Sequence, residues 1–86
     1  MKLAGTVILY NPDISIIDNM ITYIDEIDYL FVIDNTEKAD KKIASKLKKF
    51  GEKIEYHSFG ENLGIAKALN TAAKLAIEKG FSHLLT

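Results

Sequence analysis

The chain has 86 residues, no cysteine, and 11 basic against 12 acidic side chains, which leaves a net charge of −1. A chain of this length forms one small domain or a piece of a larger one. Its near-neutral charge gives no electrostatic reason to expect nucleic acid or an anionic membrane as a partner. The missing cysteine excludes disulfides and thiolate metal sites, and with no signal-peptide pattern it favours a cytoplasmic protein.

The first expected strand is Thr6–Tyr10, a short β-branched and aromatic run of the kind that is buried on both faces of a sheet. Asn11-Pro12-Asp13 ends it, because proline cannot continue a ladder and Asn and Asp favour turns. Apolar residues then recur at helical spacing, at Ile14, Ile17, Met20, Ile21 and Ile24. We expect an amphipathic helix that turns this stripe toward the core.

The second strand is expected at Tyr29–Ile33, which has the same buried pattern and ends in Asp34-Asn35-Thr36. The segment from Glu37 to Phe50 is rich in lysine and carries a narrow apolar stripe, which predicts a second helix. Acidic residues flank its lysines. We therefore interpret them as a solvated helix face rather than a basic binding patch.

The third strand is expected at Ile54–Phe59, whose stronger alternation favours a place near the sheet edge. A third helix follows and ends at Gly80, and its small residues let it lie close to a sheet. Its predicted apolar face consists of Ile65, Leu69, Ala72, Ala73, Ala76 and Ile77. Phe81–Thr86 is expected to form a fourth strand.

The resulting order is β-α-β-α-β-α-β, which predicts an α/β fold: a three-layer, Rossmann-like parallel sheet with the strand order 3-2-1-4 and right-handed crossovers. Ligands of such sheets bind outside the carboxyl ends of the strands. Three segments are expected at this edge: Tyr10-Asn11, Asp34-Asn35 and Phe59 to Gly64.

Asp34 and Asn35 allow two interpretations. In dinucleotide-binding folds an acidic residue after the second strand accepts a hydrogen bond from the ribose. The alternative is an Asx turn in which Asp or Asn caps the next helix, and spacing leaves both open. Tyr10 and Asn11 could stack beside a base and hydrogen-bond it, but spacing alone favours a packing role for the tyrosine.

Asn62 and Gly64 open the third helix. Free N–H groups and the positive end of the dipole at such a start can hold an anion or a nucleotide. Their structural roles would be a cap from Asn and a tight turn at Gly. The sequence lacks a G-x-G-x-x-G motif, a P-loop and a nucleophile–base set. His57 and His83 have no partner at metal spacing, so no catalytic or metal-binding residue is assigned.

Three blocks of the sequence, in order, resemble family-2 glycosyltransferases, with a spelling closest to the bacterial rhamnosyltransferase-like branch. They are Thr6–Pro12, Val32–Asn35, and Asn62–Ala66 with Ala68–Asn70. The resemblance implies a GT-A fold, whose N-terminal half is a nucleotide-binding sheet. It also implies transfer of a sugar from a UDP- or dTDP-linked donor, such as dTDP-rhamnose, to a glycan or lipid-linked glycan acceptor.

The resemblance also implies where the donor binds. The base and ribose would lie near Tyr10, Asn11, Asp34 and Asn35, and the turn at Asn62 and Gly64 would form a wall of the pocket. Many members have Ala-Arg-Asn where this chain has Ala68-Leu69-Asn70, so an arginine contact to the donor is not carried over.

The family's Asp-x-Asp motif, which holds Mg²⁺ or Mn²⁺, is expected beyond Thr86. Residues 1–86 would then be the nucleoside-binding N-terminal part of a metal-dependent enzyme. This part would be inactive alone and would bind no metal itself, and the full-length enzyme could associate with a membrane.

Two other classes of function remain open. A non-catalytic α/β domain could use its surface for protein contacts, and a sheet surface exposed by truncation would favour a homodimer. Another nucleotide-binding α/β enzyme would want a Gly-rich, basic loop after the first strand, and Asn11-Pro12-Asp13 does not provide one.

Overall fold

A computed structural model describes residues 3–81 and 83–85 of the chain. The strands are β1 (Leu3–Leu9), β2 (Tyr29–Asp34), β3 (Ile54–Ser58) and β4 (His83–Leu85); the helices are α1 (Ile16–Tyr23), α2 (Lys41–Lys48) and α3 (Ile65–Glu78), with short 3₁₀ turns η1 (Ile24–Glu26) and η2 (Gly51–Lys53). The predicted β-α-β-α-β-α-β order is confirmed. Ser82 and Thr86, two residues of the predicted fourth strand, lie outside the described residues.

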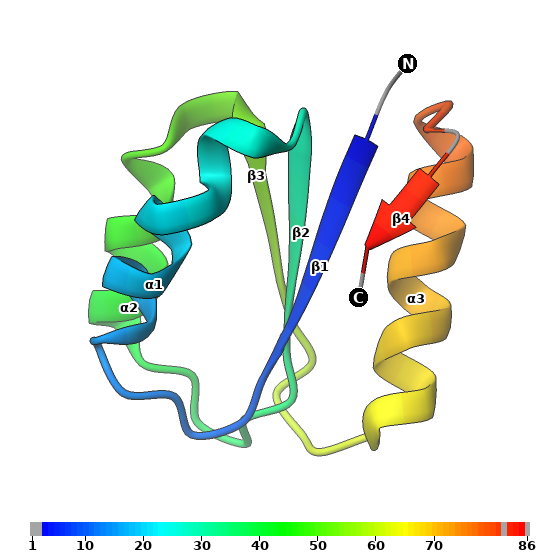
Figure 1. Cartoon of the computed structure of the whole chain (residues 1–86). Helices are drawn as coiled ribbons and strands as arrows, with labels where there is room; N and C mark the ends of the chain where they lie inside the picture. The colour runs from blue at the N-terminus through cyan, green and yellow to red at the C-terminus, as the bar shows by residue number, and fades with distance from the viewer. Residues whose placement is uncertain (1–2, 82, 86) are drawn as a thin grey trace.

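The four strands form one parallel sheet in the order β3-β2-β1-β4, which confirms the predicted fold class and strand order. This is the Rossmann-like sheet expected for the first half of a GT-A fold. The predicted edge position of β3 is also confirmed. Leu9 lies opposite Asp34, and Asp34 lies opposite Ser58, so β1, β2 and β3 end level with one another (Figure 1).

Helices α1 and α2 cover one face of the sheet and α3 covers the other (Figure 1). Side chains alternate between the two faces along each strand, so the strands contribute residues to two separate buried clusters. The cluster under α1 and α2 contains Leu9, Ile17, Met20, Ile24, Ile27, Leu30, Val32, Ile43 and Leu47. The cluster under α3 contains Ala4, Phe31, Ile33, Ala68, Ala72 and Ala76. β2 is buried on both faces as predicted, whereas Val7 and Ile8 of β1 are only half-buried.

The predicted apolar stripes of α1 and α3 are partly wrong. Ile14 and Ile21 are exposed, and the buried side of α1 is formed by Ile17 and Met20. Ile65 and Ile77 of α3 are also exposed. A face built from Ala68, Ala72 and Ala76, spaced four residues apart, packs on the sheet instead.

Small side chains bring α3 close to the sheet, and glycine ends the helix. Gly80 adopts φ 81°, and its N–H donates to the Ile77 carbonyl while the Phe81 N–H donates to the Ala76 carbonyl, both at 3.0 Å. This is a Schellman motif, which needs the left-handed backbone that glycine adopts without strain. It turns the chain from α3 back toward β4 beside β1.

Candidate functional site at the carboxyl edge of the sheet

The loops after β1, β2 and β3 meet at the carboxyl edge of the sheet. The Asn35 N–H donates to the Leu9 carbonyl at 2.8 Å, and the Phe59 N–H donates to the Asp34 carbonyl at 3.0 Å. The Thr36 hydroxyl accepts from the Asn11 N–H at 2.8 Å and ties the first loop to the second. The three segments predicted to lie at this edge are therefore brought together.

Asn35 ties the second loop to the third. Its side chain is 2 % exposed; Nδ2 donates to the Gly64 carbonyl at 3.3 Å and Oδ1 accepts from the Leu63 N–H at 3.4 Å. Both ends of the amide are occupied by the loop that leads into α3. Asn35 thus acts in this structure as a clamp between the two loops.

Asp34 is buried at the end of β2, with an exposed fraction of 1 %. Its Oδ1 accepts from the Thr36 N–H at 2.9 Å, which forms the Asx turn that the sequence left as one of two interpretations. It does not cap the following helix, because Asp40 does so by accepting from the Lys42 N–H. The Oδ2 atom accepts from the Tyr56 hydroxyl at 2.6 Å.

Asn62 and Gly64 form the turn that precedes α3. Asn62 Oδ1 accepts from the Gly64 N–H at 3.0 Å, so the expectation that Asn62 caps the helix itself is wrong. Gly64 occupies the N-cap position with φ 87° and ψ 162°, a region that only glycine adopts readily. Asn62 lies two residues before the N-cap Gly64, so its side-chain hydrogen bond stays within the loop and caps no N–H group of the helix.

The six predicted residues divide into an exposed rim and a buried floor. Tyr10 is 53 % exposed, and Asn11, Asn62 and Gly64 are exposed as well. Asp34 and Asn35 lie beneath them. Asn11 has φ 45°, a left-handed backbone that Asn tolerates better than most residues.

Thr36 and Tyr56 take part in this edge and were not predicted. Thr36 directly follows Asp34 and Asn35, so its position beside the site could have been predicted from the sequence. Tyr56 offered no such signal, because only the register of β3 against β2 puts it opposite Val32 and beside the end of β2.

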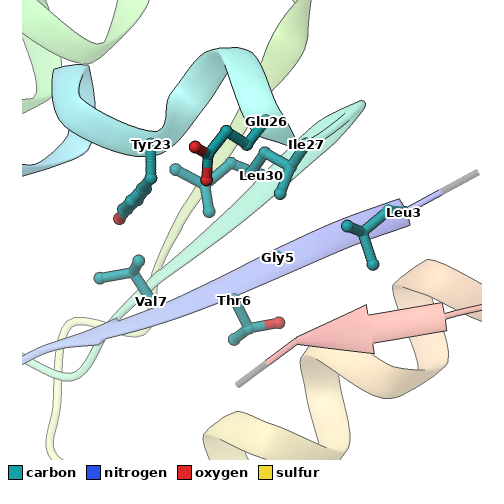
Figure 2. A pocket seen from close by; sticks show the side chains of 8 residues that line it. All are labelled: Leu3, Gly5, Thr6, Val7, Tyr23, Glu26, Ile27 and Leu30. Atoms are coloured by element: carbon teal, nitrogen blue, oxygen red, sulfur yellow. The ribbon is translucent and has the colours of Figure 1, made fainter.

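An apolar hollow of about 350 Å³ lies elsewhere, over the first part of β1. Tyr23, Ile27 and Leu30 lie around it on the α1 side of the strand, while Thr6 points to the other side (Figure 2). Gly5 forms its floor, since an added Cβ would come within 3.1 Å of the Ile27 Cδ1 atom. Its apolar lining does not suit a nucleoside diphosphate, and its position does not match the carboxyl edge.

A wider groove of about 840 Å³ lies between the turn after β1 and α2. Lys41, Lys42, Lys46 and Lys49 line it together with Asp13 and Asp40. These lysines lie on the exposed side of α2, opposite the buried Ile43 and Leu47, as predicted for a solvated face.

A second polar cluster lies at the amino edge of the sheet. Glu55 accepts from the Tyr29 hydroxyl at 2.9 Å, is 3.2 Å from the Lys79 ammonium, and pairs with His57. Burial would raise the pKa of Glu55, but these hydrogen bonds outweigh it and hold the pKa below its ordinary value. His57 is therefore engaged with a carboxylate here, consistent with its predicted structural role.

Neither a metal cluster nor a membrane span is found within residues 3–81 and 83–85. No group of three or more His, Cys, Asp or Glu side chains in this part of the chain is arranged to hold a metal ion. None of the helices described is long and apolar enough to cross a membrane.

Comparison with known proteins identifies the family. Residues 14–80 match the family described as Glycosyl transferase family 2. The chain belongs to this family. It is also 31% identical over 85 residues to the dTDP-rhamnosyl transferase RfbF of Shigella flexneri, a match that covers 98% of this chain and 28% of that protein. The chain thus spans less than a third of the length of this relative. No solved structure matches it significantly.

Proposed function

We propose that residues 1–86 are the nucleoside-binding N-terminal part of a glycosyltransferase, followed in the full protein by the Asp-x-Asp motif. The observation that carries this proposal is the joining of three loops at the carboxyl edge, through Thr36 and Asn35, into one exposed rim over a buried carboxylate. Family membership supports the transfer of a sugar from a nucleotide-sugar donor to a glycan or lipid-linked glycan acceptor. The activity named for the Shigella relative favours a dTDP-linked donor, dTDP-rhamnose, over a UDP-linked one.

The roles of the rim follow from its chemistry. The exposed ring of Tyr10 offers a stacking face for a base, and the side chains of Asn11 and Asn62 offer donors and acceptors beside it. The carboxylate of Asp34 has about four acceptor positions and uses two of them in this structure, so it retains capacity for a donor on the base or ribose.

Access to Asp34 sets a condition on binding. Its side chain is almost fully covered, so a nucleoside donor reaches it only when the loops above it part. The long hydrogen bonds of Asn35, at 3.3 and 3.4 Å, are the weakest of those that join the loops, and they are the ones we expect to yield.

A divalent cation on the diphosphate is expected for the full-length enzyme, but the acidic residues described here do not fit one. Asp34 and Asp13 belong to no group of three or more His, Cys, Asp or Glu side chains that could hold a metal ion within residues 3–81 and 83–85. We therefore assign Mg²⁺ or Mn²⁺ to an Asp-x-Asp motif beyond Thr86. The gene sequence after Thr86 tests this, because a motif absent from the next few residues would contradict it.

The binding experiment titrates UDP and dTDP against isotope-labelled protein and follows backbone amides. We expect shifts at Tyr10, Asn11, Asp34 and Asn62. Shifts confined to the apolar hollow over β1, or no shifts at all, would contradict the proposal.

Asp34→Asn sharpens this experiment. Asparagine keeps an oxygen for the Thr36 N–H, whereas alanine would leave that group and the Tyr56 hydroxyl without a partner. We expect affinity to fall about tenfold, the loss of a hydrogen bond to a charged group. Asp25→Asn, an exposed site with the same change in charge, is the control and should bind as the wild type does.

A protein-contact role is the second candidate, and the apolar hollow lined by Leu3, Val7, Ile27 and Leu30 favours it. We propose that a second copy packs against this hollow. Sedimentation velocity over a range of concentrations tests this: Val7→Lys should abolish a concentration-dependent dimer, and a wild type that stays monomeric throughout would contradict it.

A further inference from the structure

Two hydrogen bonds orient the Asp34 carboxylate, and they come from different kinds of structure. One is donated by the Thr36 N–H at 2.9 Å, from the loop directly after β2. The other is donated by the Tyr56 hydroxyl at 2.6 Å, from the neighbouring strand β3, 22 residues away in the sequence. The second is the shorter of the two and lies in the range typical of a hydroxyl donating to a carboxylate.

The Tyr56 anchor belongs to the sheet. Its backbone lies in the β2–β3 ladder opposite Val32, and its ring packs on the buried cluster that contains Leu47. Thr36, by contrast, lies in the loop after β2, which meets the loop before α3 through the two long hydrogen bonds of Asn35. When the loops part, the bond from Tyr56 is the one that can persist.

The Tyr56 hydroxyl also remains a hydrogen-bond donor at neutral pH. Burial raises its pKa, and the hydrogen bond to Asp34 and the negative charge of that carboxylate raise it further. Its hydroxyl therefore keeps its proton, and that proton satisfies one oxygen of a nearly inaccessible carboxylate, which would be costly to leave without partners.

We propose that Tyr56 is a positioning residue for nucleoside recognition, whose hydroxyl holds the Asp34 carboxylate at the orientation in which its free lone pairs meet a nucleoside donor. This inference rests on the proposed function of the carboxyl edge. Tyr56 does not touch the ligand. It acts through Asp34, and it sets the affinity for the nucleoside rather than only the stability of the fold.

The chain offers a matched control for this pair. Tyr29 on β2 donates its hydroxyl to the carboxylate of Glu55 on β3 at 2.9 Å, so it also joins a tyrosine to an acid across the same two strands. That pair lies at the amino edge, away from the three loops. Tyr29→Phe and Tyr56→Phe each remove one such bond and keep the ring, and they differ in whether the acid belongs to the candidate site.

The experiment compares the wild type, Tyr56→Phe, Tyr29→Phe, Asp34→Asn and the double variant Tyr56→Phe/Asp34→Asn. Affinity for UDP and dTDP is measured by titration, and stability by urea unfolding of the same samples. We expect Tyr56→Phe to weaken binding about tenfold, because one charge-assisted hydrogen bond no longer holds the acceptor. Tyr29→Phe should bind within about twofold of the wild type even where it is less stable.

The double variant separates positioning from general support of the fold. If Tyr56 acts through Asp34, removing its hydroxyl costs almost no further affinity once Asp34 is neutral, so the two effects are not additive. Three results would overturn the inference: equal losses of affinity in Tyr56→Phe and Tyr29→Phe, a loss of stability alone, or full additivity in the double variant. In each case weaker binding by Asp34→Asn would still support the proposed function. A wild type that binds neither nucleotide would overturn both.

Discussion

Asn35→Ala tests whether the buried amide is a clamp that shapes the candidate site. The substitution removes the hydrogen bonds to the Gly64 carbonyl and from the Leu63 N–H, and with them the side-chain link between the loop after β2 and the loop before α3. The sheet hydrogen bonds and the link from Thr36 to Asn11 stay in place. We therefore expect a protein that folds but is less stable and holds its third loop loosely.

The magnitude follows from the geometry of the two bonds. At 3.3 and 3.4 Å both are longer than the usual N–H···O distance, so each should contribute at the lower end of the range for neutral bonds. Leu63 and Gly64 are exposed, so water can satisfy the groups that lose their partner. Together these points give a loss of about 1 kcal/mol in the free energy of unfolding, or a fall in Tm of about 4–8 °C for a domain of this size.

Thermal and urea unfolding followed by circular dichroism measure this loss, and amide exchange at Leu63 and Gly64 reports on the loop. Asn70→Ala makes the same chemical change at an exposed position of α3 and should leave stability unchanged or slightly raised, since alanine is the better helix former. An Asn35→Ala protein within about 0.5 kcal/mol of the wild type, with unchanged exchange, would refute the clamp.

Two further predictions concern the scaffold. Ala72→Leu should destabilise the domain by about 1–3 kcal/mol in urea unfolding, because Ala72 is fully buried where α3 meets the sheet, whereas Ala66→Leu on the exposed side should change little; equal effects would contradict the packing described. The lowered pKa of Glu55 means that its contribution to stability is present above the ordinary value of 4.5 and is lost as the pH falls toward the lowered folded value. Glu55→Gln should therefore show a smaller loss of stability across that acid range, and an unchanged slope would contradict the cluster at the amino edge.

The order of elements and the sheet topology could be predicted because each rests on short-range pattern. Val and Ile runs that stop at Asn-Pro or Asp-Asn mark the strand ends, and alternation with helical segments implies a parallel sheet. The helix faces were less predictable. Ile21 and Ile77 fit a helical stripe by spacing, yet both are exposed. Periodicity reports which residues share a side of a helix, but it does not report which neighbouring element is close enough to cover them.

The candidate site was predictable as a location but not as a set of contacts. Topology alone brings the ends of β1, β2 and β3 to one edge, and with them the six residues chosen from the sequence. The conformation of the loops decides that Asp34 and Asn35 are buried and that Tyr10 is exposed. The bond from Tyr56 to Asp34 depends on the register of β3 against β2, and neither residue type nor spacing encodes that register in a form that can be read from one sequence.

The division between rim and floor bears on how one edge can be both stable and selective. A carboxylate open to water would gain little from one more hydrogen bond, because water already supplies competing donors. Asp34 is instead held by Tyr56 in a position that water barely reaches. A hydrogen bond donated to it there by a ligand would not compete with one from water, and the low local dielectric would strengthen that bond. If the edge binds a nucleoside as proposed, the loops must part before the nucleoside can enter, and the long bonds of Asn35 lower the free energy that this opening requires. On this reasoning, strengthening the clamp would stabilise the domain and weaken nucleoside binding, and loosening the Tyr56 anchor would weaken binding without opening the loops.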